Sequence, residues 1–476
     1  MVHQVHRYIR RGIGNTALHR WRISLFGAML SLSSAVLWSA PAHAVPAFAR
    51  QTEQACAACH VGSFGPQLTA YGRNFKLNGY TWGNNVSALN SISGMAFGGI
   101  EHTNVDMRKG SELGASGPTS HFAGNDNWTV DQASLFYGGR ISENIGMLAQ
   151  ATYKNPQASF GWDNTDIRYA DSGSVLGTDF VYGVTVNNNP SVQDVWQTSP
   201  GWWFPYVSSV LVPGPASNTS PQLMGAQAQK VGGIGLYALW DDLLYTEFSA
   251  YHSLSPSTQR TLGVAGSLNA DYLNGVNPYW RVALQHDYGT QYVALGTYGM
   301  VFNRYPGNDR SQGSDQLTDY AVDATYQATL AGGDHIISVY GTAIREALNL
   351  KGTFGNSNVA GSDNPHDRLT SFRANASYYY HNLYGLTVSR FATFGNTDAT
   401  YYGTNSGKPN SSGWTLQVDA SPFGTDESPG YPYLNARFFV QLTLYDRFNG
   451  SASNYDGTGR NASDNNTLFT GVWMAF

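Results

Sequence analysis

From about residue 89 to the C-terminus, apolar and polar side chains alternate in short segments that are separated by turns. In the segment 414–420, Trp, Leu, Val and Ala occupy one face, and Thr, Gln and Asp occupy the other. The segments 320–328 and 434–444 show the same alternation. A period of two is typical of β-strands with one apolar and one polar face. The chain is therefore predicted to be all-β.

The connections between these segments fall into two length classes. Short turns are predicted at 142–144, 241–242, 287–289, 332–334 and 381–383. Long polar connections are predicted at 188–228, 253–277, 302–316, 349–367, 395–411 and 448–464. Outer-membrane β-barrels have short periplasmic turns, long outer loops and an even number of strands. We therefore expect an antiparallel outer-membrane β-barrel of about 16 strands with an apolar exterior and a wet lumen.

Two connections depart from this scheme, and the C-terminus supports it. The connection near 421–432 is longer than a periplasmic turn should be, and an extra strand near 261–269 is expected inside an outer loop. The last segment, 468–476, alternates apolar residues and ends on Phe476, like the signal that outer-membrane assembly machinery reads. A soluble β-sandwich or propeller would need a repeat or a continuous core, which the sequence does not show.

Composition agrees with a barrel and argues against nucleic acid as a partner. Only 12% of the residues are charged, whereas 53 are Gly and 30 are Tyr, which favours strands joined by polar turns. The net charge of −5 provides no basic surface for nucleic acid.

The first 44 residues resemble an export signal. Several arginines precede an apolar run at 23–38, and Ala42-His43-Ala44 supplies a small-x-small cleavage pattern. A retained membrane anchor is the alternative, but the run is shorter than the ~20 apolar residues that a spanning helix needs. We expect residues 1–44 to be a signal peptide that is cleaved near Ala44.

Both cysteines of the chain lie in one motif, Cys56-Ala57-Ala58-Cys59-His60. The C-x-x-C-H spacing is the signature of c-type haem attachment. Cys56 and Cys59 would form thioethers with the haem vinyl groups, and His60 would be the proximal iron ligand. A redox disulfide and half of a zinc site are the alternatives. A zinc site would need a second pair of ligands nearby, and a redox motif would need a βαβ unit. Neither is apparent.

A helix is predicted directly after the motif. Its apolar face is predicted from the spacing of Leu68, Tyr71 and Phe75. Pro66 suits its first turn. Arg73 and Lys76 favour its C-terminal end, and Gly79 is its expected cap. The segment 45–88 is therefore a short haem unit, too small to bury a haem by itself. We expect it to plug the lumen of a barrel formed by 89–476.

The distal haem ligand is less constrained than the proximal one. The nearest downstream candidates are Met95, His102 and Met107. Met95 begins the first predicted strand, in the alternation class of Ser91, Ser93 and Glu101. That parity directs Met95 into the lumen, where it would either ligate the iron or only fill space. Methionine ligation would raise the haem potential relative to two histidines.

Three acidic positions are expected to face the lumen. These are Glu101, Asp323 and Asp419. We interpret them as solvated residues of the barrel interior rather than as metal ligands.

The chain is similar to the fused monohaem cytochrome–porins of iron-oxidising bacteria over nearly its whole length. The resemblance rests on the export signal, on the segment 49–60 that contains CAACH, on the helix segment 66–80, and on Asn188-Asn189-Pro190 followed by Trp196 and 204–206. It implies an Fe(II)-oxidising cytochrome at the cell surface, which passes the electron through haem to a periplasmic c-type cytochrome. Cys56, Cys59 and His60 carry over as haem residues, and no iron-binding residue carries over.

Physical reasoning supports a haem on a barrel. The hydrocarbon layer is ~30 Å thick, which one tunnelling step cannot cross, and a haem in the lumen divides that distance. Two alternatives stay open at this stage. One is a passive porin or transporter with an accidental C-x-x-C-H motif, and the other is a haem conduit that exports electrons to an external acceptor.

Overall fold

The computed structural model describes residues 47–107, 122–155, 158–199, 209–216, 218–264, 272–359 and 361–476. All of them belong to one compact unit, Ala44–Phe476. The export signal expected at 1–44 lies outside the described residues. Among the residues described, no helix is long and apolar enough to cross a membrane.

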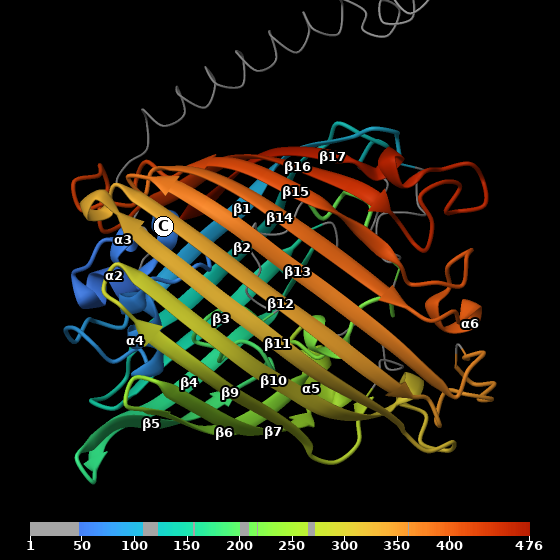
Figure 1. Ribbon diagram of the computed structural model, residues 1–476, viewed down its shortest axis with the longest axis horizontal. Coiled ribbons are helices and arrows are strands. Elements are labelled where there is room, and N and C mark those ends of the chain that lie inside the picture. The colour runs from blue at the N-terminus through green and yellow to red at the C-terminus, as the bar shows by residue number, and fades with distance from the viewer. Residues whose placement is uncertain are drawn as a thin grey trace, which may run out of the picture. The chain divides into compact units, whose positions relative to one another are not determined.

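Sixteen long antiparallel strands form a closed barrel, as the sequence predicts (Figure 1). Each long strand pairs with the next one along the chain, and β17 closes the barrel by pairing with β1, with Ile100 opposite Thr470. The strands are β1 Ile92–Thr103, β2 Trp128–Arg140, β3 Ile145–Lys154, β4 Ser159–Val175, β5 Thr178–Asn187, β6 Val231–Trp240, β7 Leu244–Ser253, β9 Asn277–Asp287, β10 Gln291–Tyr305, β11 Asp315–Leu330, β12 His335–Asn349, β13 His366–Tyr380, β14 Tyr384–Gly395, β15 Ser411–Ala420, β16 Asn435–Arg447 and β17 Thr467–Ala475.

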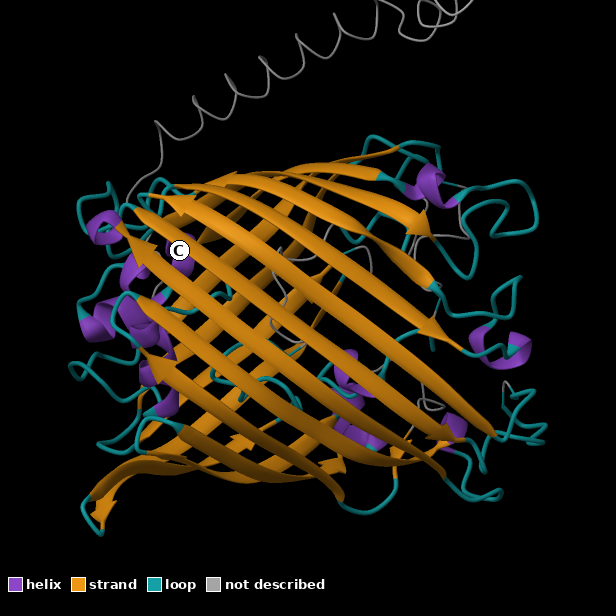
Figure 2. Cartoon of the chain, in the orientation of Figure 1, coloured by secondary structure: helices purple, strands orange, loops and turns teal. Residues whose placement is uncertain are grey.

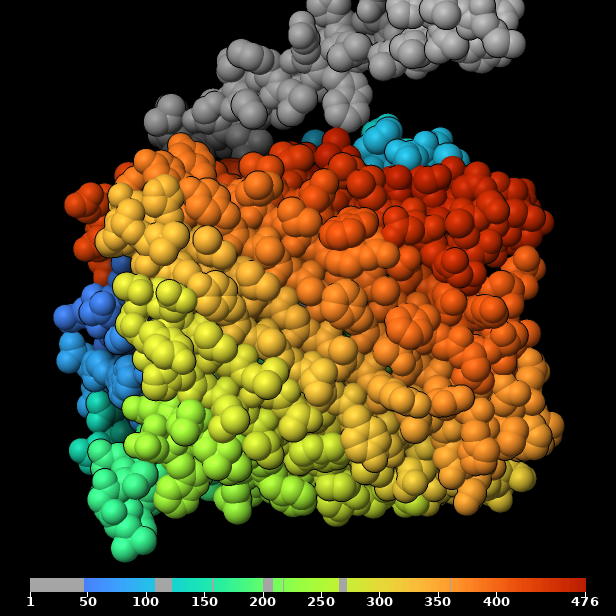
Figure 3. All heavy atoms as spheres, viewed as in Figure 1, coloured from blue at the N-terminus to red at the C-terminus, as the bar shows by residue number. Residues whose placement is uncertain are grey.

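The alternation predicted from the sequence sets the two faces of the wall. On β11, Val322 is 56% exposed, whereas its neighbour Asp323 is 4% exposed. Val418 of β15 and Val440 of β16 likewise face outward. Their polar neighbours on the same strands, such as Asp419 and Gln441, face inward. Figure 3 shows one side of this wall as a continuous layer of side chains. A lipid environment requires an apolar exterior. It also requires a closed barrel, because closure leaves no strand edge with unpaired backbone groups.

All five predicted short turns are confirmed and lie at one end of the barrel, here called the short-turn end. The sequence reasoning missed a sixth turn, at 176–177 between β4 and β5. The extra strand expected near 261–269 is absent from 261–264, the described part of that range. Helix α5 (Pro256–Thr261) ends there and residues 262–264 form a turn, while 265–271 lie outside the described residues. A two-residue strand, β8 (Tyr272–Leu273), pairs with β10 instead.

Residues 47–91, here called the N-terminal segment, occupy the short-turn end (Figure 2). The segment contains α2 (Ala47–Thr52), α3 (Cys56–Cys59), the 3-10 turn η3 (Val61–Ser63) and α4 (Ala70–Leu77). Helix α4 is shorter than predicted, because Thr69 is its N-cap and accepts a hydrogen bond from the Gly72 amide. Pro66 and Leu68 therefore precede the helix. Gly79, with φ of 69°, follows the C-cap Asn78, as the sequence suggests.

Among the described residues, apolar clusters fill part of the lumen, beside the polar side chains that the alternation predicts there. The outer half of the barrel holds an apolar cluster that includes Leu223, Tyr298, Phe302 and Ile344. Short helical elements lie at or near this end: α6 (Ala399–Tyr402), η6 (Gln222–Met224), η7 (Pro306–Asn308) and η9 (Ala462–Asn465). At the short-turn end, η8 (Ala331–Gly333) forms a turn.

The connection 188–230 does not behave as the polar outer loop that was expected. Its described part, here called the inward loop (188–199, 209–216 and 218–230), folds into the barrel. Trp196 is 1% exposed and donates from Nε1 to the Tyr292 hydroxyl at 2.6 Å. Tyr292 is the second residue of β10, beside the short-turn end. The inward loop therefore reaches the same half of the lumen as the N-terminal segment.

Candidate haem site

The Cys56-x-x-Cys59-His60 motif forms one helical turn followed by an extended residue. In α3 the two cysteines are three residues apart, so their side chains are neighbours on one face. Both thiols are free and half-buried. The His60 amide donates to the Cys56 carbonyl at 2.8 Å, and His60 then forms a β-bridge with Leu68. The motif thus presents two thiols and an imidazole from a single compact turn.

The N-terminus of α4 is hydrogen-bonded to this turn. The Thr69 amide donates to the Cys59 carbonyl at 3.0 Å, and the Thr69 hydroxyl donates to the Ala58 carbonyl. Helix α4 comes so close that a Cβ on Gly72 would lie 2.3 Å from the Cys59 carbonyl oxygen. Only glycine fits that approach.

We expect Gly72→Ala to displace the motif from α4. The new methyl group would collide with backbone, so the cost should be about 1–3 kcal/mol, typical of overpacking. Amide hydrogen exchange in the N-terminal segment should accelerate, and the yield of haem-loaded protein should fall. Asn74→Ala, on the exposed side of the same helix, is the matched control and should change the free energy of local opening by less than about 0.5 kcal/mol. Equal exchange rates in the two variants would contradict this account of Gly72.

The His60 ring is suited to ligate a metal as the neutral imidazole. Burial lowers the pKa of His60 to about 4, helped by the nearby Arg437 charge and opposed by the Gly65 backbone. Its Nδ1 is buried and has no hydrogen-bond partner among the described residues. Neutral imidazole is the ligating form of histidine.

The two thiols do not resemble a redox pair. Burial raises the pKa of Cys56 to about 11 and that of Cys59 to about 12. The reactive cysteines of redox pairs have a lowered pKa, because the thiolate is the nucleophile. Over the described part of the chain, no group of three or more His, Cys, Asp or Glu side chains could hold a metal ion. The donor set of two thiols and one neutral imidazole fits a covalently attached haem.

The barrel wall closes around the residues that follow His60. The Gly62 amide donates to Asn382 Oδ1 at 2.9 Å, and Asn435 Nδ2 donates to the Ser63 carbonyl at 2.7 Å. Arg437 Nη2 donates to the Gly62 carbonyl at 2.9 Å. Sequence reasoning did not identify these wall residues.

The overlong connection noted at 421–432 covers the motif from the other side. It spans residues 421–434 between β15 and β16, and the Ala57 amide donates to the Gly424 carbonyl at 3.0 Å. Tyr431 of this connection lies near Cys56. Its unusual length was therefore a usable signal, because a simple turn could not reach the motif.

Lys76 lies in the last turn of α4, as predicted, and Arg73 lies one turn earlier. Both side chains point into the barrel. Arg73 donates to Gln327 Oε1 at 2.7 Å and lies 3.6 Å over the Tyr292 ring. Lys76 Nζ donates to the Val192 and Asp194 carbonyls at 2.7 and 2.8 Å. Burial, followed by the Arg168 charge, lowers the pKa of Lys76 to about 7. Lys76 thus joins the N-terminal segment to the inward loop.

Met95 faces the lumen, as its parity predicts, and is 8% exposed. It belongs to an aromatic cluster with Phe64 of the N-terminal segment and with Phe97, Phe439, Phe469 and Trp473 of the wall. The rings of Phe64 and Trp473 are 4.9 Å apart. Met95 therefore packs beside the N-terminal segment, next to Phe64. Phe64 is four residues after His60.

The two other distal candidates lie far from the motif. His102 is seven residues, roughly 23 Å, further along β1 than Met95, and it pairs with Asp126 at 2.7 Å. Met107 follows β1 and packs against Leu211.

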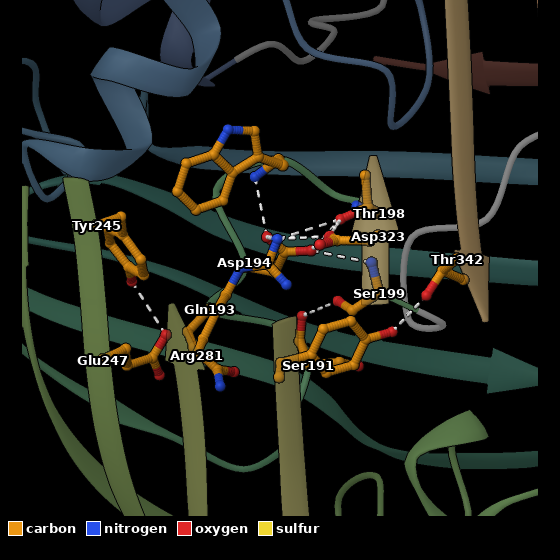
Figure 4. Close-up of polar contacts among 12 residues, drawn as sticks. Ser191, Gln193, Asp194, Thr198, Ser199, Tyr245, Glu247, Arg281, Asp323 and Thr342 are labelled. Atoms are coloured by element: carbon orange, nitrogen blue, oxygen red, sulfur yellow. Dashed lines mark hydrogen bonds and ion pairs between the residues drawn. The ribbon is translucent and has the colours of Figure 1, made fainter. Parts of the chain in front are cut away.

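A buried polar cluster midway along the barrel anchors the inward loop (Figure 4). Arg281 of β9 bridges Asp323 of β11 at 2.5 Å and Asp194 of the loop at 3.6 Å. Asp194 also accepts from the amides of Trp196 and Ser199 at 3.0 and 2.9 Å. Although burial alone would raise it, the Arg281 charge and these donors lower the pKa of Asp194.

The three lumen acids expected to be solvated are instead buried and bonded. Glu101 accepts from the Asn127 amide at 3.1 Å and is 0% exposed. Asp323 pairs with Arg281, and Asp419 pairs with Arg437 at 3.3 Å. Asp323 is covered by Thr198 of the inward loop, and the partner of Asp419, Arg437, contacts Gly62 of the N-terminal segment. Glu101 is bonded instead to Asn127, just before β2.

No family model matches the chain, and no curated protein matches it. Solved structures that resemble it include OmpT, an outer membrane protein of Vibrio cholerae, at 8% identity and a TM-score of 0.39, with 81% of this chain and 96% of that chain covered. Salmonella typhi OmpF is similar at 11% identity and a TM-score of 0.42, with 81% and 97% covered. The outer membrane channel DcaP of Acinetobacter baumannii has 9% identity and a TM-score of 0.42, with 81% and 96% covered.

The chain's own architecture assigns its location. A closed, even-numbered antiparallel barrel with an apolar exterior and short turns at one end is the architecture of bacterial outer-membrane proteins. The protein is an outer-membrane β-barrel, and the short-turn end is its periplasmic end.

Proposed function

We propose that this protein oxidises extracellular Fe(II) and passes the electron through one covalently bound haem c to a soluble periplasmic carrier, such as a c-type cytochrome. The observation that supports the proposal most is the CAACH turn, whose free thiols and neutral imidazole are fixed within the periplasmic end of a membrane barrel. Cys56 and Cys59 would hold the haem, and His60 would ligate its iron.

Haem supplies reversible one-electron chemistry: each Fe(II) loses one electron and leaves as Fe(III), and the periplasmic carrier takes up that electron. The chain's residues position this chemistry. Phe64 and Trp473 form an apolar contact beside the motif, and Tyr379 packs against Val61. These side chains would exclude water from the haem, and exclusion of water is one of the protein's controls on haem potential.

A passive porin is the alternative function, which the barrel fold also fits. The inward loop and the N-terminal segment occupy the lumen, where Trp196 and Lys76 are almost fully buried. Haem staining of a denaturing gel separates the two functions, because thioether-bound haem remains on the unfolded chain. A stained band at the mass of this chain is expected, and an unstained band would overturn the haem proposal.

A conduit that exports electrons is separated from an Fe(II) oxidase by the haem potential. Export requires a potential well below that of the Fe(III)/Fe(II) couple at the working pH. We expect a redox titration of the purified protein to give a potential high enough to accept electrons from Fe(II). A much lower potential would favour export.

Met95 is proposed as the distal ligand of the haem. Met95→Leu keeps the packing volume and removes the sulfur, so the barrel should lose less than about 1.5 kcal/mol. If Met95 ligates the iron, the haem spectrum should change and the potential should fall, because methionine raises it. Met300→Leu, in the apolar cluster of the outer half, is the matched control and should change neither. An unchanged spectrum and potential in Met95→Leu would exclude Met95 as a ligand.

A further inference from the structure

One arginine of the barrel wall contacts the residues that follow His60. Arg437 lies on β16, faces the lumen and is 1% exposed. Its Nη2 donates to the Gly62 carbonyl at 2.9 Å, two residues after His60. Its guanidinium also lies 5.8 Å from the Phe64 ring and 5.6 Å from the Tyr379 ring. A full positive charge is therefore buried against the turn that follows the proximal histidine.

The counter-charge of Arg437 stands behind it in the wall. Asp419 of β15 approaches Arg437 Nε at 3.3 Å, and both side chains are almost fully buried. Arg437 Nε also donates to Ser421 Oγ at 3.2 Å, and Gln417 Nε2 donates to Asp419 at 3.0 Å. The arginine touches the N-terminal segment directly, whereas these contacts hold the aspartate within the wall. The positive charge is thus the nearer of the two to His60.

Buried charges act on a haem more strongly than surface charges do, because the protein interior screens them less. A positive charge near the iron stabilises the ferrous form, which carries one positive charge fewer than the ferric form. It therefore raises the reduction potential. A negative charge has the opposite effect, and a more distant one has a smaller effect.

From this arrangement we infer that the Arg437–Asp419 pair sets the haem potential, with Arg437 raising it and Asp419 partly offsetting the rise. The inference rests on the proposed haem at Cys56, Cys59 and His60. It assigns the tuning of the haem to the barrel wall, outside the N-terminal segment. Arg437 acts as a positioning residue, since it contacts the haem-binding turn through Gly62.

Redox titration of the full-length protein in detergent, followed at the haem α-band, tests the inference. Arg437→Gln should lower the potential by about 59 mV, equivalent to a roughly tenfold change in the ferrous-to-ferric ratio. Asp419→Asn should raise it by a smaller amount. The double variant should fall between the two, and Arg437→Lys should keep most of the wild-type potential because it keeps the charge.

The controls separate tuning from damage to the fold. Arg390→Gln removes the same charge from a partly exposed pair with Asp446, and its potential should equal that of wild type. Each variant is first checked for haem staining and for heat-dependent migration of the folded barrel. Shifts of the same sign in Arg437→Gln and Asp419→Asn, or no shift in either, would overturn the inference while leaving the haem proposal intact. A wild-type protein that does not stain would overturn both.

Discussion

Cys56→Ala combined with Cys59→Ala is expected to abolish covalent haem binding while leaving the barrel folded. The chain contains no other cysteine, so no thioether can form elsewhere. Both side chains are half-buried on one short helical turn, and their loss removes little packing. Haem staining should be lost completely, and the mass of the denatured protein should fall by one haem in addition to the two sulfur atoms.

A control within the same turn makes this result specific. Ala58→Ser keeps both thiols and the C-x-x-C-H spacing, and it should stain like wild type. Heat-dependent migration on gels should show a folded barrel in all three proteins. Residual covalent haem in the double cysteine variant would contradict the assignment of the motif.

Asp166→Ala is expected to cause the largest loss of stability, about 3–5 kcal/mol, which is typical of breaking a buried ion pair. Asp166 and Arg168 are both 0% exposed and 2.9 Å apart. Asp166 also accepts from the Tyr80 hydroxyl at 2.7 Å, and Arg168 donates to the carbonyls of Lys76 and Gln193. This pair joins the wall, the N-terminal segment and the inward loop. Without Asp166, the positive charge of Arg168 remains buried and loses the counter-charge that Asp166 supplies.

The measurement is thermal unfolding in detergent together with limited proteolysis of the N-terminal segment. The segment of Asp166→Ala should be cleaved faster than that of wild type. Asp171→Ala, on the same strand but facing away from the lumen, is the matched control and should behave like wild type. Adding Arg168→Met to Asp166→Ala should recover part of the stability, because the isolated charge is gone. An Asp166→Ala protein as stable as the Asp171→Ala control would show that the pair does not hold these parts together.

The barrel was predictable because its wall obeys a local rule. Residues such as Val322 and Asp323 alternate with a period of two, and that period alone decides which face each side chain occupies. The short turns were predictable for the same reason, since the alternation stops there. Met95 was placed in the lumen by parity, and the structure agrees.

The interior was not predictable from local pattern. Arg73 and Lys76 look like ordinary C-terminal charges of a helix, and only their contacts with Gln327 and Val192, more than a hundred residues away, show their role. The inward loop carries more apolar residues than the outer loops, such as Val195, Trp196 and Leu211. The distant partners of its buried polar groups, such as Arg281, are not visible in the local pattern. Arg437 has the same parity as other lumen residues, and nothing local distinguishes it.

The central claim is that Fe(II) gives its electron to a haem held by Cys56, Cys59 and His60. The most direct measurement is anaerobic mixing of Fe(II) with the oxidised purified protein while the haem α-band is recorded. The account predicts that the α-band of reduced haem appears in wild type and is absent in the double cysteine variant. A wild-type protein that contains haem and shows no reduction by Fe(II) would contradict it.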